Sequence, residues 1–350
     1  MKISDSNLLP RGSAGGRQTE PAHWEYHWKR LRHRLLEPLV DWRDRVMFGP
    51  RMPVRPNRHD VSARVPTGAP PFFILGSPRS GTTLLRQMIN RHPEVFIPPE
   101  NGEIQSMVRT FGRLRHSPWP DVVRAVLDRF ACGYEAPFWE IDLQRVAERA
   151  NALAPLHRSL AGIFGVLYSE YGRQHAPGKR RWGDKSTPGH FQYLNKLDYV
   201  FPDARFVHII RDGRDSVLSC VRTGFYDGSY VKAAHAWTEN VRACDRFGRR
   251  CGPDRFLSIR YEDLVDSPPL LIKHICGFLG IEFTPAMTSD IVDRRNLSGD
   301  VIALPHHRNV LQPVSSASVG NWRSALPRQS QSVVTSIMRG ELRSHGYELT

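Results

Sequence analysis

Short apolar runs alternate with longer amphipathic segments along the central part of the chain. Phe72-Phe73-Ile74-Leu75 is apolar on both faces, which is typical of a buried parallel strand. Similar runs occur at 94–97, 205–210 and 255–260, and apolar residues recur at helical spacing over 104–115, 121–130, 143–171 and 270–279. Strands that alternate with helices predict an α/β fold with a doubly wound parallel sheet flanked by helices.

The chain divides into a tail, an extension and one large domain. Residues 1–20 are polar and are predicted to be a disordered tail, part of which, LLPRGS, resembles a protease-cleavage tag. Residues 21–70 are predicted to form an N-terminal helical extension over Trp24–Met47 and a linker. That basic, aromatic helix either lies on a membrane surface or packs on the domain with its arginines reaching solvent. Residues 71–350 are predicted to be a single domain with a helical insertion at 101–180.

The net charge of +14 over 350 residues favours anionic partners, although charge alone does not choose among them. The arginines are scattered along the sequence, so no continuous basic surface for specific nucleic-acid binding is expected. The five cysteines form no C-x-x-C pair, which favours free buried thiols in a reducing compartment. No apolar stretch approaches the roughly 18 residues of a membrane helix, and the N-terminus lacks the apolar core of a signal peptide. We therefore expect a cytoplasmic protein without a transmembrane segment, for which peripheral membrane contact stays open.

The turn from Gly76 to Gly81 connects the first strand to a helix that starts at Thr82. Such a turn aims backbone N–H groups at one point, at the positive end of the helix dipole, and so forms an anion site. Its spacing is P-loop-like, but Thr82 stands in place of the lysine that reaches β- and γ-phosphates. A single phosphate that carries a transferable group fits this turn better than ATP or GTP, and Arg79 adds a cation to it.

Four motifs resemble the sulfotransferases that use 3′-phosphoadenosine 5′-phosphosulfate (PAPS). Pro78-Arg79-Ser80-Gly81-Thr82-Thr83-Leu84 resembles their 5′-phosphosulfate loop, and Phe206 to Ser219 resembles their 3′-phosphate strand and helix. Tyr261-Glu262-Asp263-Leu264 and Gly320-Asn321-Trp322-Arg323 also match. The resemblance covers roughly residues 70 to 327, and the four motifs stand in the family's order.

The resemblance implies a donor site with two phosphate-binding ends. Backbone amides from Ser80 to Thr83, with the hydroxyls of Thr82 and Thr83, would bind the 5′-phosphate beside Leu84. Arg211, Ser219 and Arg323 would bind the 3′-phosphate of PAPS or of the product PAP, because a guanidinium can donate two hydrogen bonds at once. Tyr261, Asn321 and Trp322 lie in matched motifs and are expected at the same site. No metal is expected, since the donor has no γ-phosphate.

The resemblance also implies in-line transfer of the sulfuryl group to an acceptor hydroxyl, or to an amine. Arg79 and Lys185 would neutralise the bridging oxygen. Glu100, in Pro98-Pro99-Glu100, lies where protein-tyrosine and several carbohydrate sulfotransferases carry a glutamate base, and Glu103 and His190 are its rivals.

The resemblance implies an acceptor that is a carbohydrate, a lipid or natural-product hydroxyl, or a peptide tyrosine, with the insertion at 101–180 expected on the acceptor side. The oligomeric state stays open. Two other functions compete with sulfuryl transfer, namely a P-loop small-molecule kinase and a non-catalytic protein that binds nucleotides or nucleic acid.

Overall fold

The computed structural model describes residues 59–62, 69–186, 191–289, 300–301 and 312–349. The predicted disordered tail, the helix at Trp24–Met47 and His190 lie outside these ranges. The chain divides into two units, Met1–Arg55 and Pro56–Thr350, and all described residues belong to the second.

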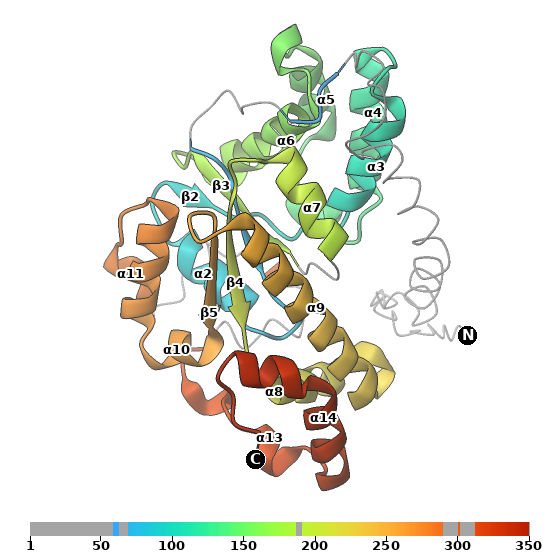
Figure 1. Ribbon diagram of the computed structural model, residues 1–350. Helices are drawn as coiled ribbons and strands as arrows, with labels where there is room; N and C mark the ends of the chain where they lie inside the picture. Colours follow the sequence, from blue (N-terminus) through green and yellow to red (C-terminus); the bar gives the residue numbers. More distant parts are fainter. Residues whose placement is uncertain (1–58, 63–68, 187–190, 290–299, 302–311, 350) are drawn as a thin grey trace, which may run out of the picture. The chain divides into compact units, whose positions relative to one another are not determined.

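Five parallel strands form one sheet in the order β2-β3-β1-β4-β5. The strands are β1 (Phe72–Leu75), β2 (Val95–Phe96), β3 (Arg181–Ser186), β4 (Arg205–Ile210) and β5 (Phe256–Arg260). Helices cover both sides of the sheet in Figure 1, with α2 and α11 on one side and α7 and α9 on the other. The predicted doubly wound α/β fold is therefore confirmed.

Twelve α-helices lie within the described ranges. They are α2 (Thr82–Asn90), α3 (Ile104–Leu114), α4 (Trp119–Ala131), α5 (Leu143–Asn151), α6 (Leu160–His175), α7 (Phe191–Val200), α8 (Gly213–Arg222), α9 (Tyr230–Cys251), α10 (Tyr261–Asp266), α11 (Pro268–Leu279), α13 (Trp322–Ala325) and α14 (Arg328–Ser344). None of them is both long and apolar enough to cross a bilayer.

Alternate residues of β1 pack into two different cores. Phe73 and Leu75 join the core built by α3 to α7 and α9, whereas Phe72 and Ile74 face α2, α10 and α11. A third cluster surrounds Ile210 at the end of β4 and joins α8 and α9 to α13 and α14. The central strand is thus fixed on both faces, and its carboxyl end holds the turn at 76–81.

Strand β3 was not predicted, because Arg181-Trp182-Gly183-Asp184-Lys185-Ser186 is not an apolar run. All six residues are buried, and their polar groups find partners. The Arg181 guanidinium donates to the carbonyls of Pro70 and Leu279. The Asp184 carboxylate accepts from the Tyr168 hydroxyl and from the Ser186 hydroxyl, both at 2.6 Å. These tertiary bonds offset the cost of burying a polar strand.

The cysteines differ in part from the prediction of buried thiols. All five are free, and Cys220, Cys244 and Cys276 are buried. Cys251 is only partly buried and Cys132 is exposed at the end of α4.

Candidate functional site

The turn between β1 and α2 is packed too tightly for side chains at its glycines. A Cβ added to Gly76 would lie 2.8 Å from the Ile209 carbonyl oxygen of β4. Gly81 has a φ of +94° and Arg79 a φ of +67°, so both adopt the left-handed conformation that a tight turn requires. Helix α2 begins directly after Gly81, and its first amides have no acceptor within the helix. This geometry suits an anion at the helix N-terminus.

Tyr261 joins this turn to Arg211. The Arg211 guanidinium carbon lies 4.6 Å from the centroid of the Tyr261 ring, and a Cβ on Gly81 would lie 2.4 Å from the same ring. The Tyr261 hydroxyl and the Ser318 hydroxyl are hydrogen-bonded at 2.8 Å, and Arg211 donates to the Ser318 carbonyl. A further bond runs from Arg211 to the Arg79 carbonyl at 3.1 Å. Strand β4, helix α10 and the C-terminal loop thus fix one cation beside the turn.

The Arg79 side chain points from the turn toward α8. Its Nε donates to the Ser219 hydroxyl at 3.0 Å, and burial lowers the pKa of its guanidinium. Two predicted residues that are 140 positions apart in sequence are therefore in direct contact.

A cavity of about 570 Å³ lies between these groups. The predicted residues that line it are Arg79, Gly81, Thr82, Thr83, Leu84, Arg211, Ser219, Tyr261 and Asn321. Residues that were not predicted complete the wall, among them Asp215, Leu218 and Arg222 from α8 and residues 312–315, 317 and 318.

Three buried polar atoms in the turn and on Arg211 have no hydrogen-bond partner among the described residues. They are the hydroxyl oxygens of Ser77 and Ser80 in the turn and Nε of Arg211. Unsatisfied buried donors are costly, so they favour a ligand with several acceptor oxygens. A phosphate group fits this donor set.

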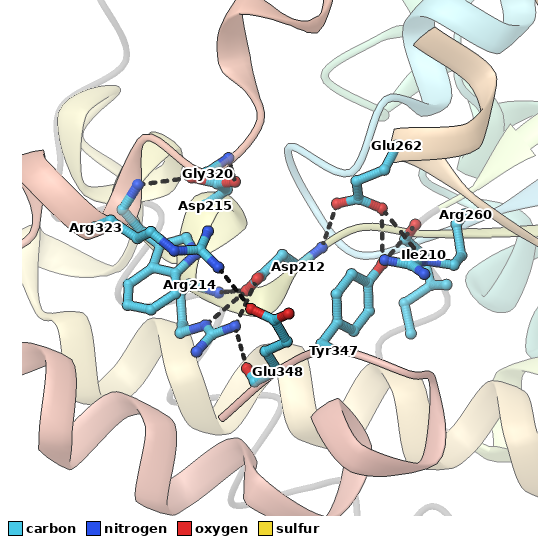
Figure 2. Close-up of polar contacts among 11 residues, drawn as sticks. Ile210, Asp212, Arg214, Asp215, Arg260, Glu262, Gly320, Arg323, Tyr347 and Glu348 are labelled. Carbon is cyan, nitrogen blue, oxygen red and sulfur yellow. Dashed lines mark hydrogen bonds and ion pairs between the residues drawn. The ribbon is translucent and has the colours of Figure 1, made fainter. Parts of the chain in front are cut away.

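Trp322 and Arg323 do not line the cavity. The Trp322 ring is buried beneath the Arg214 guanidinium, whose carbon lies 3.7 Å from the ring centroid. Arg323 pairs with the Glu348 carboxylate at 3.2 Å on the surface, as Figure 2 shows. The predicted contact of Arg323 with a 3′-phosphate would require this side chain to turn away from Glu348.

A second group of candidate side chains lies at the ends of β2 and β3. Lys185 is in register with Ile74 of β1, and its ammonium group forms an ion pair with the Glu100 carboxylate in the loop after β2. Lys185 does not pair with its sequence neighbour Asp184, because Asp184 is buried and bonds to Tyr168 and Ser186. Burial raises the pKa of Asp184 to about 6.

Glu103 faces away from this pair and toward α4, where its carboxylate lies 3.7 Å from the Arg129 guanidinium. Glu135 was missed by the sequence analysis, and its carboxylate lies close to Gly102, where an added Cβ would be 2.8 Å from Oε2. Burial and then the charge of Glu100 raise the pKa of Glu135 to about 7. No motif marks Glu135, because it precedes a short 3-10 helix in the insertion and approaches Glu100 only through the tertiary fold.

Arg86 anchors the loop that carries Glu100. It is fully buried in α2, donates to the Pro98 carbonyl at 3.2 Å, and makes two bonds of 3.0 and 2.9 Å to the Asp300 carboxylate. The Asn90 side chain binds the same loop by exchanging two hydrogen bonds with the backbone of Ile97. Within the described ranges no three His, Cys, Asp or Glu side chains gather where they could hold a metal ion, and the metal-free reaction stays a prediction.

Solved structures with a similar fold include the sulfotransferase domain from the Synechococcus PCC 7002 olefin synthase. It is 24% identical, with a TM-score of 0.56, and the match covers 85% of this chain and all of that domain. The sulfotransferase domain from the curacin biosynthetic pathway gives a TM-score of 0.55 at 23% identity, covering 81% of this chain and 100% of that one. At these identities the likeness concerns the fold alone.

Among sequence relatives, the protein-tyrosine sulfotransferase of Drosophila melanogaster is 25% identical over 268 residues, which cover 74% of this chain and 48% of that protein. The nodulation protein NoeE of Sinorhizobium fredii is 25% identical over 310 residues, which cover 79% of this chain and 65% of NoeE. The chain thus matches about half to two thirds of the length of these relatives.

The model of the Sulfotransferase family matches residues 70–285. This range contains the turn at 76–81, Glu100, Lys185, Arg211 and Tyr261. It agrees with the predicted resemblance and spans more than half of the chain, so the protein belongs to the sulfotransferase family.

Proposed function

We propose that this protein transfers the sulfuryl group of PAPS to an acceptor hydroxyl. The observation that carries the proposal is that residues of the lysine-free turn, Arg211 and Ser219 all line the same cavity. The turn suits one phosphate, and the guanidinium of Arg211 suits another. PAPS carries phosphates at both its 5′ and 3′ ends and has no γ-phosphate.

In the proposed complex the 5′-phosphosulfate lies at the first turn of α2. The amides of Ser80 to Thr83 and the hydroxyls of Thr82 and Thr83 bind the 5′-phosphate. Arg211 and Ser219 bind the 3′-phosphate, and Tyr261 holds the Arg211 guanidinium in place. The unpaired donors of Ser77, Ser80 and Arg211 support this assignment.

The reaction then forms one S–O bond and breaks another. The acceptor oxygen attacks sulfur, and the bond from sulfur to the bridging oxygen breaks, so that its electron pair leaves with PAP. Glu100 takes the proton of the acceptor hydroxyl, while Lys185 and Arg79 stabilise the charge that develops on the bridging oxygen. The acceptor leaves as its sulfate ester.

The ion pair of Lys185 with Glu100 supports separate roles for the two side chains, Lys185 toward the donor and Glu100 toward the acceptor. Without donor, each group neutralises the other at the end of β3. The phosphosulfate brings additional negative charge, which attracts the Lys185 ammonium group and leaves the Glu100 carboxylate available to the acceptor.

The acceptor is a carbohydrate, a lipid or natural-product hydroxyl, or a peptide tyrosine. One relative is named as a protein-tyrosine sulfotransferase, and another as an omega-hydroxy-beta-dihydromenaquinone-9 sulfotransferase. In our proposal the helices of the insertion at 101–180 form the acceptor side, because Glu135 from this segment approaches the pair of Glu100 and Lys185. The cytoplasm stays our prediction for the location.

Thermal unfolding with PAP, with ATP plus Mg²⁺ and with duplex DNA tests the donor assignment, since a ligand that binds only the folded state raises the melting temperature. We expect a shift with PAP alone. A shift with ATP and none with PAP would favour the kinase, and a shift with DNA alone would favour the nucleic-acid-binding protein. Incubation of cell extract with ³⁵S-labelled PAPS, followed by mass spectrometry of the labelled products, then identifies the acceptor.

A further inference from the structure

An acidic residue lines the proposed nucleotide cavity. Asp215 lies on α8, one turn after Arg211, and is only 2% exposed. A carboxylate repels a phosphate, so its presence in an anion site requires another explanation.

Both carboxylate oxygens of Asp215 bind the backbone of the C-terminal loop. Oδ2 accepts from the Gly320 amide at 2.7 Å, and Oδ1 accepts from the Trp322 amide at 2.9 Å. Figure 2 shows Asp215 at the start of α8, directly against Gly320. The negative charge is therefore directed at two amides, and these are strong, charge-assisted hydrogen bonds.

The segment held by these bonds is a wall of the cavity. Residues 312–315, 317, 318 and 321 line the cavity, and Ser318 within the segment contacts both Arg211 and Tyr261. The segment has little regular structure of its own, because its helical parts are only three and four residues long. Such a short loop needs outside contacts to keep one conformation.

The neighbouring residue Arg214 fixes the other side of the same loop. Its guanidinium stacks on Trp322, makes an ion pair with Asp212 at 2.8 Å and donates to the Glu348 carbonyl at 2.6 Å. Asp212 itself caps α8 by accepting from the Arg214 amide at 2.9 Å. The two aspartates thus differ in role, since Asp212 stabilises its own helix and Asp215 binds a distant segment.

We propose that Asp215 is a positioning residue for the donor nucleotide, because its carboxylate holds the loop at 312–322 in place as a wall of the nucleotide cavity. This inference rests on the proposed function. It predicts that loss of the carboxylate weakens nucleotide binding more than it slows the chemical step.

Asp215→Asn tests the proposal, because the amide keeps the size of the side chain but offers only one acceptor oxygen. We expect the Kd for PAP and the KM for PAPS to rise at least tenfold, while kcat at saturating donor changes less than threefold. Asp142→Asn is the matched control, since Asp142 also accepts from two amides, those of Gln144 and Arg145, but caps α5 outside the cavity. The control should leave both constants unchanged.

Hydrogen exchange without nucleotide provides a second readout. Asp215→Asn should accelerate exchange at Gly320 and Trp322, whereas Asp142→Asn should not. If Asp215→Asn does not fold, Asp215→Ser, which also keeps one acceptor oxygen, should likewise raise the Kd for PAP at least tenfold.

Unchanged PAP affinity in a folded Asp215 variant, or a fall in kcat with KM unchanged, would overturn the inference. Absence of PAP binding by the unaltered protein would instead overturn the proposed function. In that case the exchange rates still decide whether Asp215 holds the loop.

Discussion

Lys185 and Glu100 form an ion pair between the end of β3 and the loop that follows β2. The side chains are 9% and 25% exposed, so both are largely withdrawn from solvent. Lys185 lies beside the central strand, and the pair thus stands next to the turn at 76–81. This contact assembles the two proposed reactive groups before donor binds.

Glu100→Gln should lower kcat about 10² to 10⁴-fold, because a positioned general base contributes about that much. The affinity for PAP should stay the same, since Glu100 does not line the cavity. Steady-state rates and PAP titration check both values. Glu103→Gln serves as the control, and a loss of turnover in that variant with normal turnover in Glu100→Gln would assign the base to Glu103.

Arg211→Ala should weaken PAP binding about 10- to 100-fold, because a charge-assisted contact to a phosphate contributes roughly 1.5–3 kcal/mol. Calorimetric titration measures the change. The exposed Arg249 on α9 provides the control Arg249→Ala, for which unchanged affinity is expected. Equal losses in both variants would mean that overall charge, rather than a specific contact, drives binding.

Arg86→Met should destabilise the fold by about 3–5 kcal/mol, because it leaves the Asp300 carboxylate buried without its cation. Urea unfolding measures the loss. Arg124→Met removes an exposed pair with Asp121 and should cost less than about 1 kcal/mol. Similar midpoints for the two variants would contradict the role of Arg86.

His208 should make the protein sensitive to acid. Burial lowers the pKa of this imidazole on β4 from its ordinary 6.5 to about 4. The unfolded chain therefore binds the proton more readily, and stability falls as the pH decreases from about 6.5 to 4, by up to about 3 kcal/mol. His208→Asn should flatten this slope in urea unfolding at several pH values. The exposed His274→Asn should retain it.

Ionisation of Glu135 should change the stability in the opposite direction to that of His208, over nearly the same pH range. Its pKa is raised from 4.5 to about 7, so the folded state holds the proton more tightly, and stability decreases as the pH rises from about 4.5 to 7. We expect Glu135→Gln to gain about 1 to 2 kcal/mol at pH 8, a value reduced for partial exposure. The same urea series checks this value. Glu239→Gln, at an exposed site on α9, should show no gain.

The sequence predicted those parts of the site that local pattern encodes. The strand at Phe72–Leu75, the turn to Gly81 and the junction of β4 with α8 all combine an apolar run with a recognisable turn, and the structure contains each of them.

The parts that were missed depend on partners far away in sequence. Lys185 was singled out, but its strand was not, because the buried polar groups of β3 are satisfied only by residues such as Tyr168. The helices α9 and α14 were not predicted either, and they pack on each other across about a hundred residues. Arg86 resembles an ordinary helix residue until Asp300 and Pro98 are brought to it.

The close approach of Tyr261 to Gly81 makes these positions depend on each other. Any side chain at 81 meets the Tyr261 ring, and a smaller residue at 261 would remove the surface on which the Arg211 guanidinium rests. Substitutions at 81 and 261 should therefore be strongly non-additive. A smaller residue at 261 would relieve the steric clash of a side chain at 81 but not the strain of its positive φ, so glycine stays the favoured residue at this point of the proposed donor site.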